Sequence, residues 1–509
     1  MKRYFATFSC LLLVLTGVSS SIAQQYVMGI STVPGQGSVL MSFNGSIPNL
    51  RLISTQKNFP VTPISFSDQD DSLLFYSNGS FIENKYGLKI SGSDSLAPPL
   101  YYTYGAPCQM GIIALPRGEP TSALFDLFHV DYDSLLQGLW PSRLLHTSIN
   151  FASNNDSGLC IINSEVVLRD TLVPGFIVST RQGNGRDFWL VVQKFESNKY
   201  FIILNSIEGI TIREQVIGSP KLSYLEAGAA AFSPDGTVYA RFDHWNGLEL
   251  LEFDRCSGSF MSVISLPTSL FADTNQFWYN QNHNDPTGLV FSPNSRYLYI
   301  VRTNQLYQLD LQLIGQASAI QLVASYDGTR DTTNNQRMLF GTPFLAPNGV
   351  IYLYYGGGKW IASIPNPDLT APACGFNRTA LYYPGLGYAG LPQPPNYYLG
   401  RLTGSLCDTL EWTGVASGTQ TEIVWELSPN PAIHEVLVSL KAGSGVSGGA
   451  AVEVYALYSL DGRLLKRVSA TNGAATRLWV GDLPAGLYLL QAQQNGYVLG
   501  SRRLAVVRD

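Results

Sequence analysis

Phe232-Ser-Pro-Asp-Gly-Thr-Val-Tyr239 is the clearest copy of a short pattern that recurs along this chain. Proline sets φ near −65° for the second position of a turn, Asp or Asn tolerates the third, and Gly supplies conformational freedom at the fourth. The aromatic and β-branched run that follows predicts a strand. Further copies are Phe291-Ser-Pro-Asn-Ser-Arg-Tyr-Leu-Tyr299, Leu345-Ala-Pro-Asn-Gly-Val-Ile-Tyr352 and the degenerate Phe66–Phe75.

The spacing of these copies predicts the architecture. The three clear copies lie roughly 55 to 60 residues apart, close to the repeat length of β-propellers. A four-stranded antiparallel sheet with its turns needs about that many residues. Fully apolar runs at 297–301 and 350–355 suit strands covered on both faces. We therefore expect an all-β chain in which residues 24–412 form a propeller of about seven blades. A string of separate sandwiches is the alternative, but the linkers it needs are missing.

Composition narrows the class of protein. Of the 509 residues, 45% are hydrophobic and only 14% are charged, which excludes disorder for most of the length. Aromatics reach 12%, as expected of many short strands. The formal net charge is −5, and no basic patch appears, so we expect no nucleic-acid partner. Nothing in the sequence indicates a cofactor.

The first residues have the pattern of a targeting segment. Lys2 and Arg3 precede the apolar run 11–15, and small residues occupy 21 and 23. This predicts a secretory signal peptide over 1–23, with Gln24 as the mature start. The run is too short to span roughly 30 Å of hydrocarbon, and no later stretch is long enough. We expect no integral membrane segment in the mature chain.

Cysteine spacing leaves the redox chemistry open. No Cys-x-x-Cys occurs, so neither a zinc site nor a thioredoxin-like motif is expected, and we predict no metal site. Cys374 and Cys407 are the nearest pair along the chain. Either they bridge neighbouring strands or both are small buried hydrophobic residues.

The C-terminal part has its own pattern. Gly, Ser, Thr and Ala dominate 413–422, which predicts a linker. Strand-like segments then alternate with strong turn pairs such as Asn472-Gly473 and Asn495-Gly496. Residues 423–509 therefore predict a small immunoglobulin-like β-sandwich. The expected strands are 436–440, 452–457, 464–469, 476–480, 487–491 and 504–507.

This tail resembles the type A C-terminal sorting domain of the type IX secretion system. The resemblance rests on Pro429-Asn430-Pro431, on Tyr455–Leu464 with Asp461-Gly462, on Leu483–Tyr488 with Gly486 and Tyr488, and on Arg502–Val507. It implies a protein of the Bacteroidota lineage that uses the type IX secretion machinery as its partner. It also implies a secreted or outer-cell-surface location.

The body is similar to uncharacterised secreted propeller proteins that carry such a tail. The matching phrases include 74–79, 183–189, 247–258, 366–368 and 396–400. The resemblance implies a propeller architecture and a secreted location, but it implies no activity. Proteins of this lineage carry O-glycans at Asp-(Ser/Thr)-apolar triplets, which implies exposed hydroxyls at Ser72 and Ser95.

Catalytic signatures are weak. Gly445–Gly449 fits the nucleophile-elbow spacing, but it lies in a Gly-rich loop of the tail and not between a strand and a helix. Asp68–Asp71 lacks the spacing of a calcium loop and reads better as a solvated turn. Propeller glycosidases use carboxylates from different blades, yet turn capping and pairing with Arg is the better interpretation of the carboxylates here. We predict no catalytic residue, and the carboxylates weighed are Asp187, Asp243, Glu249, Asp254 and Asp285.

Aromatic loops are the strongest hint of binding. Rings stack on sugar faces or other apolar ligands, while amide, imidazole and carboxylate groups fix orientation. Packing of the same rings between blades is the alternative. The sequence favours a non-catalytic protein that binds or displays a glycan or another surface ligand, over a secreted propeller glycan hydrolase or a purely architectural surface component. The ligand-binding candidates are Trp245, Trp278, Tyr279, His283, Asp285 and Trp360.

Overall fold

The computed structural model describes residues 24–408 and 425–508, apart from short gaps. The predicted signal peptide and linker lie outside the described residues. The chain forms two compact units that divide between Thr409 and Leu410, close to the predicted boundary at 412. The gaps are 30–37, 44–46, 56–57, 60–62, 69–71, 94–95, 103–104, 109, 119–122, 138–139, 155–156, 222–227, 244, 272–287, 303, 356–357, 386–390, 393, 441–451, 453, 460–463, 472–474 and 495–496.

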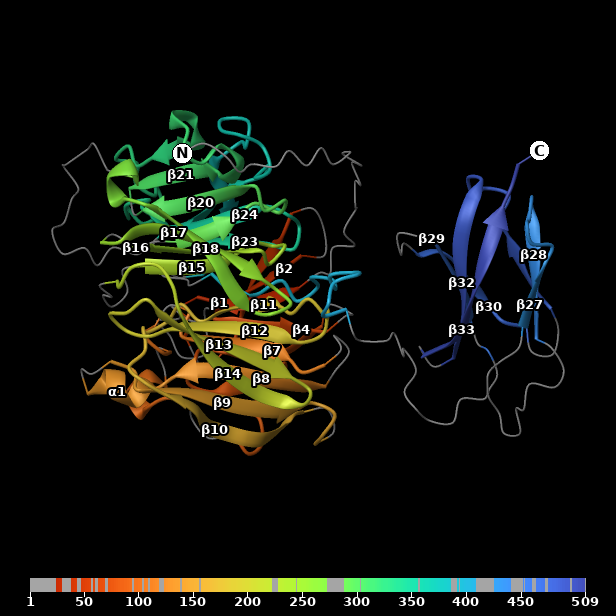
Figure 1. Ribbon diagram of the computed structural model, residues 1–509, viewed down its shortest axis with the longest axis horizontal. Coiled ribbons are helices and arrows are strands. Elements are labelled where there is room, and N and C mark those ends of the chain that lie inside the picture. Colours follow the sequence, from red (N-terminus) through yellow and green to blue (C-terminus); the bar gives the residue numbers. More distant parts are fainter. Residues whose placement is uncertain are drawn as a thin grey trace. The chain divides into compact units, whose positions relative to one another are not determined.

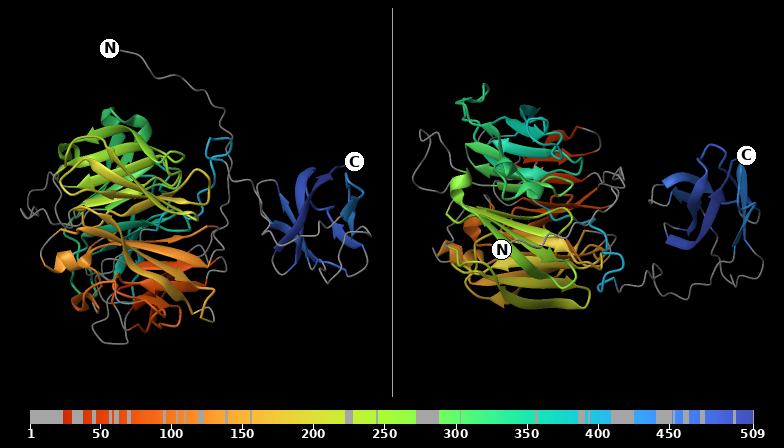
Figure 2. Two further views of the ribbon diagram at one scale, coloured as in Figure 1. Left: turned by 60° about the horizontal axis from the view of Figure 1, so that its bottom comes forward. Right: turned by 45° about the horizontal axis from the view of Figure 1, so that its top comes forward.

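Seven antiparallel sheets make up the described part of the first unit, and their strands follow chain order (Figures 1 and 2). We call them blades 1 to 7. Blade 1 is β1(Gln25–Met28), β2(Ser38–Ser42) and β3(Asn49–Ile53), and blade 2 is β4(Ile64–Ser67), β5(Leu73–Ser77) and β6(Ile82–Asn84). Blade 3 is β7(Ile112–Pro116), β8(Leu124–Val130), β9(Arg143–Asn150) and β10(Leu159–Arg169), and blade 4 is β11(Val178–Arg181), β12(Phe188–Gln193), β13(Lys199–Ser206) and β14(Gly209–Val216).

The last three blades each have four strands in simple up-and-down order. Blade 5 is β15(Gly228–Phe232), β16(Val238–Asp243), β17(Gly247–Asp254) and β18(Ser259–Leu266). Blade 6 is β19(Gly288–Phe291), β20(Tyr297–Arg302), β21(Gln305–Asp310) and β22(Ile320–Ser325), and blade 7 is β23(Phe340–Leu345), β24(Ile351–Tyr355), β25(Trp360–Ile364) and β26(Asn377–Tyr382). Short helices are η1(Pro99–Tyr101), α1(Tyr132–Leu136), η2(Thr268–Phe271), η4(Leu311–Leu313) and η5(Ala317–Ala319).

Hydrophobic clusters between successive blades join the sheets into a closed ring. Separate clusters lie between blades 1 and 2, 4 and 5, 5 and 6, and 6 and 7, and a larger one joins blades 2, 3 and 4. The ring closes where blade 1 packs on blade 7, with Tyr26 and Met41 against Phe344 and Tyr354. In Figure 1 the red strands β1 and β2 accordingly lie near β23 and β24. This confirms the predicted all-β propeller.

The repeated sequence pattern joins the first and second strands of blades 5, 6 and 7. The turn closes with a hydrogen bond from Ser233 N to Val238 O of 2.8 Å, and with its counterpart from Ser292 N to Tyr297 O of 2.7 Å. The fourth position has positive φ in all three copies, 74° at Gly236, 62° at Ser295 and 77° at Gly349. The turn chemistry read from the sequence is therefore the turn that forms, and the strand that follows it is largely buried, as at β20 and β24.

A buried polar network lies in blade 3. Asp126 is fully buried, and its carboxylate accepts hydrogen bonds from Arg117 Nε at 2.7 Å, His146 Nε2 at 2.8 Å and Asn205 Nδ2 at 3.0 Å. Burial raises the pKa of Asp126, but the bonds from His146 and Arg117 outweigh it and hold the pKa at about 2. Burial lowers the pKa of the nearby His129 to about 4, despite its bond with Val130 O.

The second unit is a two-sheet sandwich. Its sheets have the orders β27-β28-β31 and β30-β29-β32-β33, and Tyr455, Leu478 and Leu490 are among the core side chains between them. The strands are β27(Trp425–Ser428), β28(Glu435–Leu440), β29(Val454–Ser459), β30(Leu464–Ser469), β31(Thr476–Trp479), β32(Gly486–Gln494) and β33(Tyr497–Val506). Each strand expected from the sequence is present, and β27 is an additional one.

The tail motifs contribute to this sandwich. Asn430 donates to Arg503 O at 2.9 Å and accepts from Ala505 N at 2.9 Å, so it fastens the chain between Pro429 and Pro431 to β33. Tyr488 Oη donates to Pro484 O at 2.6 Å. Gly486 begins β32, and Asp461-Gly462 lies outside the described residues.

We predict that the propeller loses stability as pH falls, in two steps. The unfolded chain binds a proton at His129 near pH 6.5, whereas the folded chain resists it down to about pH 4. The carboxylate of Asp126 then contributes stability above pH 3.8 that is lost as pH falls towards 2. Urea unfolding monitored by near-UV circular dichroism at a series of pH values measures both steps.

His129→Gln should remove the step between pH 6.5 and 4, while His434→Gln, at an exposed histidine of the second unit, should leave it. An unchanged pH dependence in His129→Gln would contradict this assignment.

Candidate binding cavity

A cavity of about 750 Å³ lies on the inner side of the blades of the first unit. Its volume falls in the range of roughly 300–1,000 Å³ typical of small-molecule sites. Its walls come from β1, β7, β11, β15, β19 and β23. Each of these strands bonds to one neighbour in its sheet, so its other edge borders the cavity. The cavity is therefore the axial space that remains when the ring of blades closes.

The repeated turns converge on this cavity. Pro234, Pro293 and Pro347, the prolines of the three clear sequence copies, all line it. The copies occupy the same position in their blades, directly after the innermost strand, so ring closure brings them together. The prolines that set the geometry of these turns thus also form an apolar wall of the cavity.

The described lining contains no Asp, Glu, Lys, Arg or His. Aromatic rings come from Tyr26, Phe232, Phe291, Phe344, Tyr397 and Tyr398. Burial raises the pKa of Tyr26 and of Tyr397 well above the ordinary value, so both phenols stay neutral. The described side chains that line the cavity are therefore uncharged at physiological pH.

A segment distant in sequence lines the same space. Residues 391–392 and 394–398, which we call the axial segment, run beside the inner strands of blades 2 and 3. Tyr397 Oη donates to Ala114 O at 2.8 Å, and its ring contacts Phe66 and Phe188 at 5.0 and 6.3 Å between centroids. Asn396 Nδ2 donates to Pro234 O at 2.9 Å. The axial segment is thus a fixed wall of the cavity.

Two buried arginines hold the axial segment and the chain after it. Arg181 Nη1 donates to Tyr397 O at 2.8 Å. Arg255 donates from Nε to Arg181 O at 2.8 Å and from Nη2 to Gly400 O at 2.6 Å. Burial lowers the pKa of Arg255 to about 10, and the neighbouring Arg181 adds to the shift, so Arg255 remains protonated at neutral pH.

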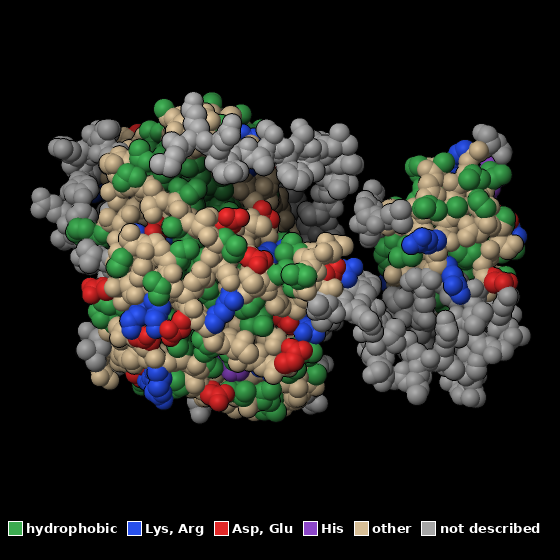
Figure 3. Space-filling model, viewed as in Figure 1, with side chains coloured by type: hydrophobic (Ala, Val, Ile, Leu, Met, Phe, Trp, Pro, Cys, Tyr) green, Lys and Arg blue, Asp and Glu red, His purple; other side chains and the backbone are tan. Residues whose placement is uncertain are grey.

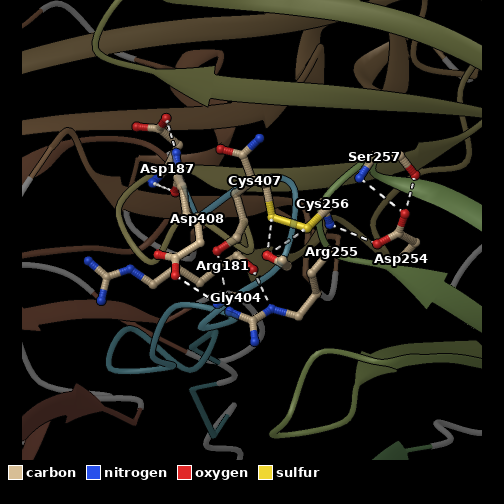
Figure 4. The surroundings of a disulfide bond; sticks show 12 residues. Arg181, Asp187, Asp254, Arg255, Cys256, Ser257, Gly404, Cys407 and Asp408 are labelled. Carbon is tan, nitrogen blue, oxygen red and sulfur yellow. Dashed lines mark hydrogen bonds between the residues drawn. A yellow bond between two sulfur atoms is a disulfide. The ribbon is translucent and has the colours of Figure 1, made fainter. Parts of the chain in front are cut away.

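A disulfide between Cys256 and Cys407 fastens the same stretch to blade 5 (Figure 4). Of the two alternatives for Cys374 and Cys407, the bridge between them is therefore wrong, and Cys407 is not a free buried thiol either. Cys374 is instead a buried free thiol in the core between blades 6 and 7. Proximity along the chain could not identify the partner of Cys407, because the two bonded cysteines are 151 residues apart.

The carboxylates weighed as catalytic groups do not meet at this cavity. Asp187 pairs with Arg186 at 2.8 Å, and Asp254 caps the turn at Cys256 and Ser257 (Figure 4). Asp243 pairs with Arg241 at 3.0 Å, and Glu249 pairs with Lys221 at 2.7 Å. Asp285 lies outside the described residues.

The aromatic candidates from the sequence divide into two groups. Trp245 lies in the turn after β16 and is 43% exposed, and Trp360 begins β25 and contacts Tyr382 at 5.6 Å between ring centroids. Neither borders the cavity. Trp278, Tyr279, His283 and Asp285 lie outside the described residues, so their role stays a prediction.

The residues that line the cavity are not among the binding residues predicted from the sequence. The signal was present, because the Pro of each repeat sits at the same position of its blade. The proline-rich run 392–395 was a second signal, since such a run does not fit the interior of a strand.

Other chemistries find no support in the described part of the chain. No group of three His, Cys, Asp or Glu side chains there is arranged to hold a metal ion. None of the helices there is long and apolar enough to cross a membrane. Figure 3 shows acidic and basic side chains interspersed on the face in view. Asp68 accepts from Ser72 N at 2.9 Å, as in a turn, and Ser72 is partly exposed, whereas Ser95 lies outside the described residues.

Tyr397→Phe should lower the free energy of unfolding by about 1–3 kcal/mol, because it leaves the buried carbonyl of Ala114 without its donor. Urea unfolding measures the loss. Tyr382→Phe, at a residue that is 50% exposed, serves as the matched control and should change stability little. Equal effects of the two substitutions would contradict the anchoring role of Tyr397.

Cys407→Ser should destabilise the first unit by about 2–5 kcal/mol, because the disulfide closes a long loop in the unfolded chain. The substitution Cys160→Ser, at a cysteine outside the disulfide, is the control. Chemical denaturation under non-reducing conditions compares the two, and a loss in Cys160→Ser as large as in Cys407→Ser would count against this interpretation.

Comparisons with known proteins add no family. No protein-family model matches the chain, and no curated protein matches it. Among solved structures, a candidate 6-phosphogluconolactonase from Bacteroides uniformis ATCC 8492 is 10% identical, with 73% of this chain and 98% of that chain covered and a TM-score of 0.41. Virginiamycin B lyase from Staphylococcus aureus is 10% identical, with 68% and 82% covered and a TM-score of 0.31. At this similarity neither neighbour's activity carries over to the present chain.

Proposed function

We propose that this chain is an exported, non-catalytic binding protein. Its propeller holds a ligand in the axial cavity, and its C-terminal unit directs export through the type IX secretion machinery to the medium or the outer cell surface. The uncharged lining of the cavity carries the binding part of this proposal.

An uncharged cavity suits binding better than hydrolysis. Glycoside hydrolysis uses two carboxyl groups on either side of the scissile bond, and general acid–base catalysis needs a group that titrates. The described lining offers neither, and Asp187, Asp243, Glu249 and Asp254 form ion pairs or cap turns elsewhere. The alternative of a secreted propeller glycan hydrolase therefore has less support.

The disulfide supports export. Disulfides persist in oxidising compartments and are rare in the bacterial cytosol. Cys256 and Cys407 are bonded across 151 residues, in a position that fastens a wall of the cavity. This agrees with the predicted signal peptide and with the sorting-domain resemblance of the tail.

The sandwich supports an independent sorting role. It has its own hydrophobic core, and the residues behind the resemblance contribute to its fold: Asn430 fastens the Pro429–Pro431 stretch to β33, and Tyr488 packs into the core. A unit that folds on its own core is suited to act as a transferable signal.

The binding function is tested with Ala231→Trp, because Ala231 lines the cavity and an indole there would fill it. Ala152→Trp, at an exposed turn residue, is the matched control. A thermal-shift screen of small molecules should find compounds that stabilise the natural protein and Ala152→Trp but not Ala231→Trp. A parallel screen of glycosides should release no product, and turnover that survives purification would favour the hydrolase.

Export is tested in a Bacteroidota host with type IX machinery. The full chain should reach the surface or medium, and a chain that ends at residue 409 should stay in the periplasm. A reporter fused to residues 410–509 should be exported in the same host and retained in a machinery-deficient strain. Export of the shortened chain would show that the tail is only a structural domain.

A further inference from the structure

We infer that the axial cavity takes an uncharged, apolar molecule that contains rings and carries one polar group, and that it rejects ions and sugars. This inference rests on the proposed binding function and names the class of ligand. Three features of the lining support it: the absence of charged side chains among the described residues, the hydrogen bonds of the polar side chains, and the apolar rings.

The lining excludes ionic ligands on energetic grounds. A buried ion is stable only when an opposite charge or several hydrogen bonds replace its hydration. No charged side chain borders the cavity among the described residues. The nearest guanidinium groups are used elsewhere, since Arg181 donates to Tyr397 O and Arg255 donates to the carbonyls of Arg181 and Gly400.

The lining also disfavours sugars, because three of its polar side chains already have partners within the protein. Ser233 Oγ donates to Asp235 Oδ1 at 2.5 Å. Asn348 Nδ2 donates to Tyr352 Oη at 3.0 Å, and Asn396 Nδ2 donates to Pro234 O at 2.9 Å. A sugar hydroxyl that loses water without gaining a partner costs about 1–3 kcal/mol. Several such hydroxyls would outweigh the gain from contact with the rings.

Apolar rings supply the attraction. Phe232, Phe291 and Phe344 come from three blades and face the same space as the prolines of the repeated turns. Aromatic side chains favour other rings in edge-to-face or offset geometry and bury a large apolar area. An aromatic or alicyclic ligand gains this area without disturbing a hydrogen bond of the wall.

One lining group fits a polar atom of the ligand. Ser179 is 4% exposed, and its Oγ has no hydrogen-bond partner among the described residues. Buried hydroxyls nearly always have a partner. Because Ser179 Oγ is closed off from solvent, a rotation about χ1 would turn it towards a ligand atom in the cavity. Ser179 Oγ offers one donor and two acceptor lone pairs, so it can bond to a carbonyl, hydroxyl or N–H group of a ligand.

The test compares two fluorescent probes on the full chain. N-phenyl-1-naphthylamine is neutral and carries one N–H, and 8-anilinonaphthalene-1-sulfonate has the same rings with a negative charge. We expect saturable fluorescence enhancement with the neutral probe and binding at least tenfold weaker with the anionic one. Cellobiose, a neutral disaccharide, should not displace the neutral probe.

Variants locate the probe. Ala231→Trp and Gln24→Trp, which both fill the cavity, should each weaken the neutral probe at least tenfold, whereas Ala152→Trp should not change it. Ser179→Ala keeps the cavity shape and should weaken the probe about two- to tenfold, the loss of one hydrogen bond. Near-UV circular dichroism checks that each variant is folded.

The outcomes separate the ligand class from the proposed function. Equal affinity for both probes, or displacement by cellobiose, would overturn the inferred class while leaving the cavity as a binding site. Probe binding that neither filling variant weakens would overturn the inferred class. If the compounds found by thermal shift also stabilised these variants, the proposed binding function would be contradicted too.

Discussion

Closure of the ring between blades 1 and 7 is the contact on which the rest of the propeller depends. Tyr26 of blade 1 packs edge-to-face on Phe344 of blade 7, with ring centroids 5.1 Å apart. A single blade has two apolar faces and cannot cover both, so each blade needs a neighbour on either side. Without this contact, blades 1 and 7 would each leave a face in water. The cavity exists because seven blades that close in this way leave a space on their axis.

The neutral character of that space follows from how the blades are built. Innermost strands pass between two neighbouring blades, and β15 and β19 carry apolar side chains on both faces. What remains for the axis is the free edge of each strand and the turn that follows it. Proline is the residue best suited to set φ in this turn, so proline rings line the cavity.

Much of this architecture was readable in the sequence, for a physical reason. Turn geometry is local, so the Ser-Pro-Asp-Gly pattern predicted the turns, the strands after them and a propeller of about seven blades. The second copy has Ser295 at the position of Gly236, and it adopts the same positive φ, so the pattern tolerated a departure from glycine. The tail strands were equally accessible, since Asn-Gly pairs separate them.

The disulfide and the axial segment were not readable, because both depend on ring closure. Cys256 meets Cys407 only after blade 5 and the end of the unit are placed side by side. Tyr397 likewise finds Ala114 across the ring, 283 residues away in sequence. No local pattern encodes a partner at such a distance. The aromatic loops drew attention because they are local clusters, whereas Phe232, Phe291 and Phe344 gather only in space.

The wall of the cavity is therefore held by the least local contacts of the molecule. Arg181 and Arg255 bond to main-chain carbonyls and not to carboxylates, which fixes the course of the backbone whatever side chains it carries. The disulfide holds the same stretch covalently. A site formed by a closing segment needs such restraints, because affinity falls when a ligand has to order its own pocket. The guanidinium groups of Arg181 and Arg255 hold this wall without lining the cavity. The wall is therefore fixed in place, and no charged side chain of the described residues lines the cavity.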